Sequence, residues 1–340
     1  MSPIYSRLLV DLCANRVPHA LMLCGPQQAG KMALAIDFAR ALLCQHPQSD
    51  GQPCGECASC RMAAKLEHPD LHFSFPIVKG TRIKETKDAI SDYFIKEWRA
   101  RVINSPYFDI NDWLADMGAE NQQAIYYVAE SDNIQRKLAL KSNQGGRKVM
   151  IVWLPEKMNS ETANKLLKLF EEPPLGTHFI MVSDEPDLVL STILSRTQRV
   201  TVPPLSREER LQAYPPKDEA QMMELFVMLM RLAYQRKVKD LRDWADQLAS
   251  IGRESQKSFL QFCQRQIREN FVYNFGKSEL NDQSTEEAAF SRNFARFINE
   301  RNVIQITEEL SKAESDVVQN VNSRMVFFDL ALKMIVLLIQ

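Results

Sequence analysis

A phosphate-loop signature near the N-terminus sets the strongest limit on how this chain can fold. Residues 25–32 read GPQQAGKM and match G-x-x-x-x-G-K-[ST] at every fixed position except the last. The apolar run HALMLCG at 19–25 predicts a buried strand before the loop, and residues 31–43 have the apolar spacing of a helix after it. A chance match is the alternative, but the flanking strand and helix favour an α/β nucleotide-binding fold.

The loop keeps the groups that hold phosphate and lacks those that hold Mg²⁺. Backbone N–H groups and a lysine at the start of a helix can bind phosphate. The predicted nucleotide-binding residues are Gly25, Gly30 and Lys31. Met32 stands where a hydroxyl normally ligates Mg²⁺, and the second predicted strand, 148–154, is followed by no carboxylate until Glu156. Two losses at one metal site predict a degenerate site that does not hydrolyse ATP.

Alternating strands and helices extend the α/β pattern to about residue 203. Buried strands are predicted at 148–154 and 178–182, with an amphipathic helix at 160–172 between them that ends at two prolines. This order predicts a mostly parallel sheet. The charged and aromatic segment 81–123 interrupts the pattern, and we interpret it as a helical insertion whose aromatic side chains pack against the sheet domain.

The C-terminal half has helical periodicity throughout and predicts an all-helical domain for assembly. The predicted helices are 222–234, 238–251, 258–275, 288–298, 303–313 and 318–339, with a loop at 276–286. The predicted domains are therefore 1–203, a short linker or reduced lid at 206–221, and a helical domain at 222–340.

The overall composition narrows the functional classes. A net charge of −1 excludes a chain that binds polyanions over its whole surface. The start of the sequence lacks the layout of a secretory signal, and Asp329 and Lys333 interrupt the longest apolar run, 325–339. We therefore expect a cytoplasmic protein without a membrane partner, with its seven cysteines reduced.

Four cysteines have the spacing of a metal site. Cys44, Cys54, Cys57 and Cys60 read C-x9-C-x2-C-x2-C with glycine, serine and proline between them. Four thiolates predict a closed, structural zinc site, because a catalytic zinc needs an open position. An iron–sulfur cluster or unrelated cysteines remain alternatives. The other cysteines, in apolar surroundings, are predicted to lie in the core: Cys13, Cys24 and Cys263.

Several of these segments together resemble one family. The run LLCQHPQSDGQPCGECASCRMAAKLEHPD at 42–70, NKLLKLFEEPP at 164–174 and the tripeptide at 195–197 are similar to segments of bacterial DNA polymerase III clamp-loader subunits, which are AAA+ proteins. The C-terminal run at 321–339 is similar to the last helix of the family's collar domain. The resemblance implies an AAA+ type P-loop domain followed by a helical collar.

The resemblance departs in several places from the family's ATP-hydrolysing gamma/tau subunit, the motor of the complex, and these departures indicate which kind of member this is. Counting back from 171–174, the motor's Asp-Glu pair falls on Trp153 and Leu154, and with Met32 this loss makes the chain look like the delta-prime type. The resemblance implies that Arg196 acts as an arginine finger in a neighbour's ATP site, with threonine replacing the cysteine that usually follows it. The sensor position near 183–184 also departs from the family pattern, and the short linker weakens the expectation of ATP binding.

The implied function is that of a subunit that does not hydrolyse ATP itself and works with gamma/tau and delta subunits to load the sliding clamp onto primed DNA. Two alternatives remain. A gamma/tau-type ATPase with unusual metal ligation would hydrolyse ATP alone, and a zinc-dependent nucleic-acid-binding module would bind DNA in a salt-sensitive way. The missing metal ligands argue against the first alternative, and the neutral charge argues against the second.

Overall fold

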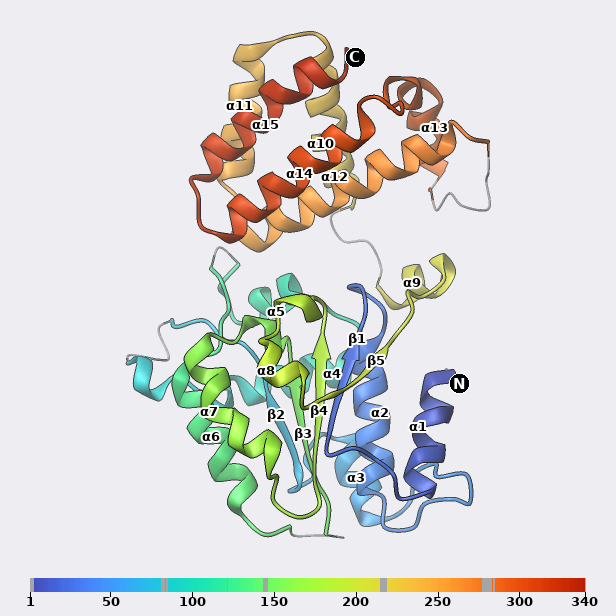
Figure 1. Ribbon diagram of the computed structural model, residues 1–340, viewed down its shortest axis with the longest axis vertical. Helices are drawn as coiled ribbons and strands as arrows, with labels where there is room; N and C mark the ends of the chain where they lie inside the picture. Colours follow the sequence, from blue (N-terminus) through green and yellow to red (C-terminus); the bar gives the residue numbers. More distant parts are fainter. Residues whose placement is uncertain are drawn as a thin grey trace. The chain divides into compact units, whose positions relative to one another are not determined.

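The computed structural model describes residues 3–80, 83, 85–120, 122–142, 146–214, 219–276, 283 and 285–339. Most of the predicted loop at 276–286, residues 215–218 of the predicted linker, and residues 81, 82, 84 and 121 of the predicted insertion lie outside this part. The chain divides into two compact units (Figure 1). The first ends at Tyr214, and the second contains the helices from residue 219 onward.

A parallel five-stranded sheet forms the centre of the first unit (Figure 1). Its strands are β1 (Ala20–Cys24), β2 (Leu71–Ser74), β3 (Lys148–Trp153), β4 (Thr177–Ser183) and β5 (Gln198–Thr201). The strand order is β2-β3-β4-β1-β5, and every neighbouring pair is parallel. Strands β1, β3 and β4 confirm the three predicted strands and the parallel sheet. Because β1 lies between β4 and β5, the loop that follows it is flanked by the carboxyl ends of both neighbours.

Helices cover both faces of the sheet, so the unit has three layers. One face packs against α1 (Pro3–Cys13), α2 (Lys31–Leu43), α4 (Ile95–Asn104) and α5 (Ile110–Asp116). The other packs against α6 (Val128–Ala139), α7 (Ser160–Glu171) and α8 (Ser191–Leu194). Helix α3 (Ala58–Ala64) lies beside α2, and α9 (Arg207–Ala213) follows β5. Burial on both faces explains why β1, β3 and β4 have nearly continuous apolar sequences.

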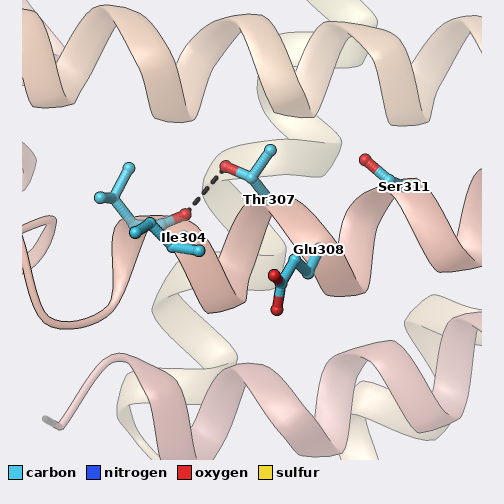
Figure 2. A pocket seen from close by; sticks show the side chains of 5 residues that line it. Ile304, Thr307, Glu308 and Ser311 are labelled. Atoms are coloured by element: carbon cyan, nitrogen blue, oxygen red, sulfur yellow. Dashed lines mark hydrogen bonds between the residues drawn. The ribbon is translucent and has the colours of Figure 1, made fainter.

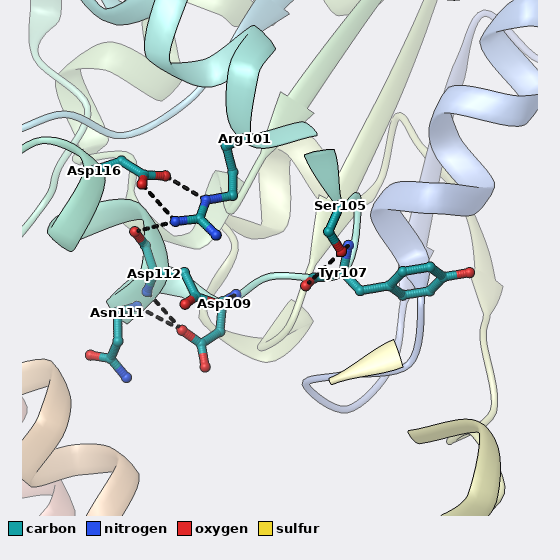
Figure 3. Close-up of polar contacts among 7 residues, drawn as sticks. All are labelled: Arg101, Ser105, Tyr107, Asp109, Asn111, Asp112 and Asp116. Carbon is teal, nitrogen blue, oxygen red and sulfur yellow. Dashed lines mark hydrogen bonds and ion pairs between the residues drawn. The ribbon is translucent and has the colours of Figure 1, made fainter. Parts of the chain in front are cut away.

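The predicted insertion is helical and is anchored by its aromatic side chains. Two short 3₁₀ turns, η1 (Thr86–Asp88) and η2 (Ser91–Phe94), precede α4 and α5. The Trp98 ring is fully buried and stacks on Phe75 with centroids 4.1 Å apart. Arg101 on α4 donates two hydrogen bonds to the carboxylate of Asp116 on α5, at 2.5 and 2.6 Å (Figure 3). The packing expected for the aromatic residues is therefore present, and a bidentate ion pair joins the two helices.

The second unit consists of helices around one apolar core. They are α10 (Glu219–Tyr234), α11 (Val238–Ala249), α12 (Arg253–Tyr273), α13 (Thr285–Phe294), α14 (Val303–Val318) and α15 (Ser323–Leu337). The core contains fully buried Phe226, Trp244, Phe259 and Phe327. The helical character of this half is confirmed, but the predicted start of the last helix at residue 318 is wrong. Helix α14 continues to Val318, and the Asn322 side chain then caps α15 by accepting the Met325 N–H.

The exposed side of α14 has a shallow depression of about 430 Å³ (Figure 2). Its labelled residues mix apolar and polar side chains: Ile304, Thr307, Glu308 and Ser311. The Thr307 hydroxyl donates to the Val303 carbonyl at 2.8 Å, so it is satisfied within its own helix. Among the described residues, no helix is long and apolar enough to cross a lipid bilayer.

Candidate functional site

The phosphate loop lies between β1 and α2, where the sequence places it. A Cβ atom on Gly25 would lie 2.3 Å from the Val202 carbonyl oxygen, so only glycine fits at the start of the loop. Gly30 precedes α2 with φ of 73°, in the left-handed region that favours glycine. The backbone conformation of the loop therefore requires both glycines, whether or not a ligand binds.

The cation of the loop is already neutralised within the chain. The Lys31 side chain is buried, with 3% exposed, and its Nζ atom lies 2.8 Å from a carboxylate oxygen of Asp184. The same atom donates to the carbonyl oxygens of Gly25 at 2.7 Å and Pro26 at 2.5 Å. An ammonium group has three N–H donors, and these three contacts use all of them. The charge that would meet a phosphate group is thus matched by a carboxylate directly after β4.

Two tyrosines lie against the same loop. The Tyr107 ring points away from the Arg101–Asp116 ion pair (Figure 3), and a Cβ atom on Gly30 would lie 3.3 Å from its Cε1 atom. The Tyr214 ring meets the Tyr107 ring edge-to-face, with centroids 5.5 Å apart. Burial raises the pKa of Tyr214, although a hydrogen bond with the Gly30 backbone acts to lower it. The phenol therefore occupies part of the N-terminal end of α2, where an anion would otherwise bind.

The positions that would hold Mg²⁺ are apolar and buried. Met32 belongs to the core on the α2 face. Trp153, at the end of β3, packs against the rings of Trp98 and Phe108, with centroids 5.2 and 5.1 Å away. Leu154 is 3% exposed. These side chains offer no hard oxygen ligand.

Glu156, the first carboxylate after β3, is engaged in local structure. Its oxygens accept the Ser183 hydroxyl at 2.9 Å, the Asp184 N–H at 2.9 Å and the Glu185 N–H at 3.2 Å. Burial, followed by the charge of Asp184, raises the pKa of Glu156 above its usual value. Glu156 thus supports the turn after β4 that presents Asp184 to Lys31.

The four predicted metal ligands lie together at the other end of α2. Cys44 follows α2, Cys54 lies in the loop, Cys57 caps α3 and Cys60 lies within α3. Their sulfur atoms all lie within 4.8 Å of one another. Since α2 rises about 1.5 Å per residue, its 13 residues separate this cluster from the phosphate loop.

The geometry of the cluster fits a tetrahedral metal ion. With metal–sulfur bonds of about 2.3 Å, ligand sulfurs lie about 3.8 Å apart. The Cys44–Cys54 and Cys54–Cys60 sulfur distances are 3.6 and 3.9 Å. Backbone N–H groups of Cys54, Cys57 and Cys60 point at the Cys44, Cys54 and Cys57 sulfurs at 3.3–3.4 Å. These residues could therefore hold a metal ion.

The acidities of the cluster differ from thiol to thiol. Burial raises the pKa of Cys60 to about 12. Burial also acts on Cys57, but hydrogen bonds from the Gln45 and Cys60 backbone lower its pKa to about 6. One thiolate thus forms readily, and a second beside it is unfavourable without a cation.

Arg196 follows α8 and lies on the opposite face of the sheet from α2. Its Nε and Nη2 atoms donate to one carboxylate oxygen of Glu171 at the end of α7, the first bond measuring 2.8 Å. Its Nη1 atom donates to the Thr192 carbonyl at 2.8 Å and to the Ser195 hydroxyl at 3.1 Å. One third of the side chain, 33%, is exposed. The structure therefore does not bring Arg196 to this chain's own phosphate loop.

The sequence profile of the family described as "DNA polymerase III, delta subunit" matches residues 2–206. The chain belongs to this family. It is 30% identical over 187 residues to the DNA polymerase III subunit delta' of Pseudomonas aeruginosa, covering 54% of this chain and 43% of that protein. It is 27% identical over 196 residues to the subunit delta' of Escherichia coli, covering 58% and 46%.

The chain thus spans less than half the length of these relatives. A solved DNA polymerase III gamma subunit-related protein from Thermotoga maritima aligns over 97% of this chain and 99% of its own, with 12% identity and a TM-score of 0.37.

Within this member of the DNA polymerase III delta-subunit family, sequence reasoning missed the residues that fill the phosphate loop. The position of Asp184 could have been inferred from the sequence, because this residue directly follows β4 at the same sheet edge as the loop. The positions of Tyr107 and Tyr214 could not, since these residues come from the insertion and from the end of α9. The sequence shows that ligands are missing, and the structure shows what stands in their place.

Proposed function

We propose that this chain is a delta-prime-like clamp-loader subunit that does not hydrolyse ATP and that places Arg196 in a neighbouring subunit's ATP site. The observation that carries the proposal is the contrast between the two sites. The chain's own phosphate loop is filled by the Lys31–Asp184 ion pair and two tyrosines, whereas Arg196 lies away from this loop, after α8, and remains partly exposed. An arginine finger supplied in trans raises phosphoryl-transfer rates by about 10³–10⁵.

The partners follow from this role. The chain is similar to subunits of DNA polymerase III named delta' and tau/gamma, which supports a gamma/tau partner, and the proposed role adds a delta subunit to the same complex. The sliding clamp and primed DNA would be reached through the complex. The helical second unit, 222–340 in the predicted division, is proposed as the assembly domain, because it is a compact helical unit with its own apolar core.

The metal proposed for the four cysteines is zinc, in a structural role. Four thiolates close a tetrahedral shell, and zinc adopts this shell in structural sites. The ion would fix the loop between α2 and α3 and neutralise the crowded thiolates.

The test is reconstitution of the complex with Arg196→Ala and measurement of DNA-stimulated ATP turnover. We expect turnover to fall by at least about 10³-fold at each site that receives this arginine. Arg199→Ala, on the exposed strand β5, is the matched control. Unchanged turnover with Arg196→Ala would refute the finger assignment, and ATP hydrolysis by the isolated chain that Lys31→Ala abolishes would restore the motor alternative.

A further inference from the structure

The C-terminal end of α7 carries negatively charged side chains, which are unfavourable at that end of a helix. Glu171 is the last residue of α7 and Glu172 caps it, just before Pro173. The C-terminus of a helix carries partial negative charge, so carboxylates there are unfavourable unless a cation compensates them. The cation that Glu171 meets is the Arg196 guanidinium, 25 residues further along the chain.

The contacts of Arg196 engage both edges of its guanidinium group. The edge formed by Nε and Nη2 faces Glu171, and Nη1 faces the Thr192 carbonyl and the Ser195 hydroxyl. Recognition of phosphate by arginine uses such paired N–H donors. In this arrangement the guanidinium group is directed at its own chain, and an incoming phosphate would have to replace the carboxylate.

We propose that Glu171 is an internal counter-ion that holds Arg196 and competes with the phosphate groups of the neighbouring subunit's ATP for it. The proposal rests on the proposed function of Arg196. Glu171 is a positioning residue, because it sets the fraction of molecules in which the Arg196 side chain is unpaired before ATP binds. Both side chains remain accessible for the exchange, at 33% and 47% exposed.

The size of the effect follows from this exposure. A partly exposed ion pair shifts an equilibrium by about two- to fivefold. Because the exchange accompanies ATP binding at the neighbour's site, loss of the counter-ion lowers KM for ATP and leaves kcat unchanged once the arginine is engaged.

The experiment uses the reconstituted complex with Glu171→Gln, and with Glu172→Gln as the matched control one residue further along. We expect Glu171→Gln to lower KM for ATP by about two- to fivefold at constant kcat. Glu172→Gln should match the wild type. In an Arg196→Ala background, Glu171→Gln should change neither constant. A rise in KM, a fall in kcat or no change with Glu171→Gln overturns the proposal.

Two measurements separate this proposal from the function on which it rests. If Arg196→Ala lowers turnover but Glu171→Gln leaves KM unchanged, only the counter-ion role fails. If Arg196→Ala has no effect, the finger assignment fails and the counter-ion role with it. In the isolated chain, the Nε–H proton resonance of Arg196 should shift with Glu171→Gln and not with Glu172→Gln, and the absence of a shift refutes the contact directly.

Discussion

The Nζ atom of Lys31 lies 2.8 Å from the carboxylate of Asp184, so the phosphate loop carries its own negative partner. Elsewhere in P-loop proteins this lysine meets the nucleotide phosphates. Here it is only 3% exposed and also holds two loop carbonyls. A nucleotide would have to break this largely buried ion pair to reach Lys31, so the ion pair, together with the missing metal ligands, opposes phosphate binding at the loop.

Replacing Asp184 by asparagine should reopen an anion site. Breaking a fully buried pair costs about 3–5 kcal/mol, and since the Asp184 side chain is 20% exposed, we expect a loss of about 2 kcal/mol in the free energy of unfolding. Pyrophosphate should raise the melting temperature of Asp184→Asn, because binding to the folded state stabilises it. It should not raise that of the wild type or of Asp187→Asn, an exposed acid in the next turn. Equal pyrophosphate stabilisation of all three proteins would contradict the role of Asp184.

The Tyr214 hydroxyl should protect the Gly30 amide. A hydrogen bond of this kind contributes about 0.5–1.5 kcal/mol, so Tyr214→Phe should speed amide hydrogen exchange at Gly30 by about two- to tenfold. The Leu34 amide, which donates to the Gly30 carbonyl at 3.1 Å, is the internal reference and should not change. Unchanged exchange at Gly30 would show that the phenol does not bond to the loop.

The buried Glu130 should give stability a measurable pH dependence. It accepts hydrogen bonds from the Ser74 hydroxyl at 2.6 Å and from the Ser91 N–H and hydroxyl, each at 2.7 Å. Burial nevertheless raises the pKa of Glu130 above 4.5. Above pH 4.5 the folded state therefore binds more protons than the unfolded state, and the contribution of Glu130 to stability falls as pH rises through its folded pKa.

The comparison protein for this effect is Glu130→Gln, which cannot titrate. The difference in unfolding free energy, wild type minus Glu130→Gln, should shrink as pH rises from 4.5 toward neutrality. Urea denaturation at a series of pH values measures it. A difference that grows over this range would mean that the folded-state pKa is lowered instead.

The sequence predicts those features that depend on neighbouring residues. The phosphate loop follows from a strand, two glycines and a helix, and the metal cluster follows from close cysteine spacing. Strand β2 is not predicted from the sequence, because its four residues, LHFS, are too few to show a hydrophobic period. The end of α14 is also not predicted. The chain turns there at Asn320, whose backbone is in the left-handed region, and no glycine or proline indicates the turn in the sequence.

The side chains that occupy the phosphate loop come from segments distant in the sequence, so their positions are harder to predict. Asp184 could be placed by the rule that carboxyl ends of parallel strands meet at one edge. Tyr107 reaches the loop only because Trp98 and Trp113 fix the insertion on the sheet, and one sequence does not define that packing.

Removal of the metal should affect the loop between α2 and α3 before it affects the sheet. The purified chain should contain one zinc ion, and Cys57→Ser should remove it. Loss of an outer-shell partner lowers metal affinity by about 10–100-fold, and loss of a ligand should lower it further. Cys13 is exposed, so its predicted place in the core is wrong, and Cys13→Ser, outside the cluster, should keep full zinc content. After chelation, limited proteolysis should cleave within residues 44–60 while the far-ultraviolet circular dichroism of the sheet persists, because the strands do not depend on the ion. Zinc content that is zero in the wild type, or lost equally in Cys13→Ser, would refute the assignment of the four cysteines.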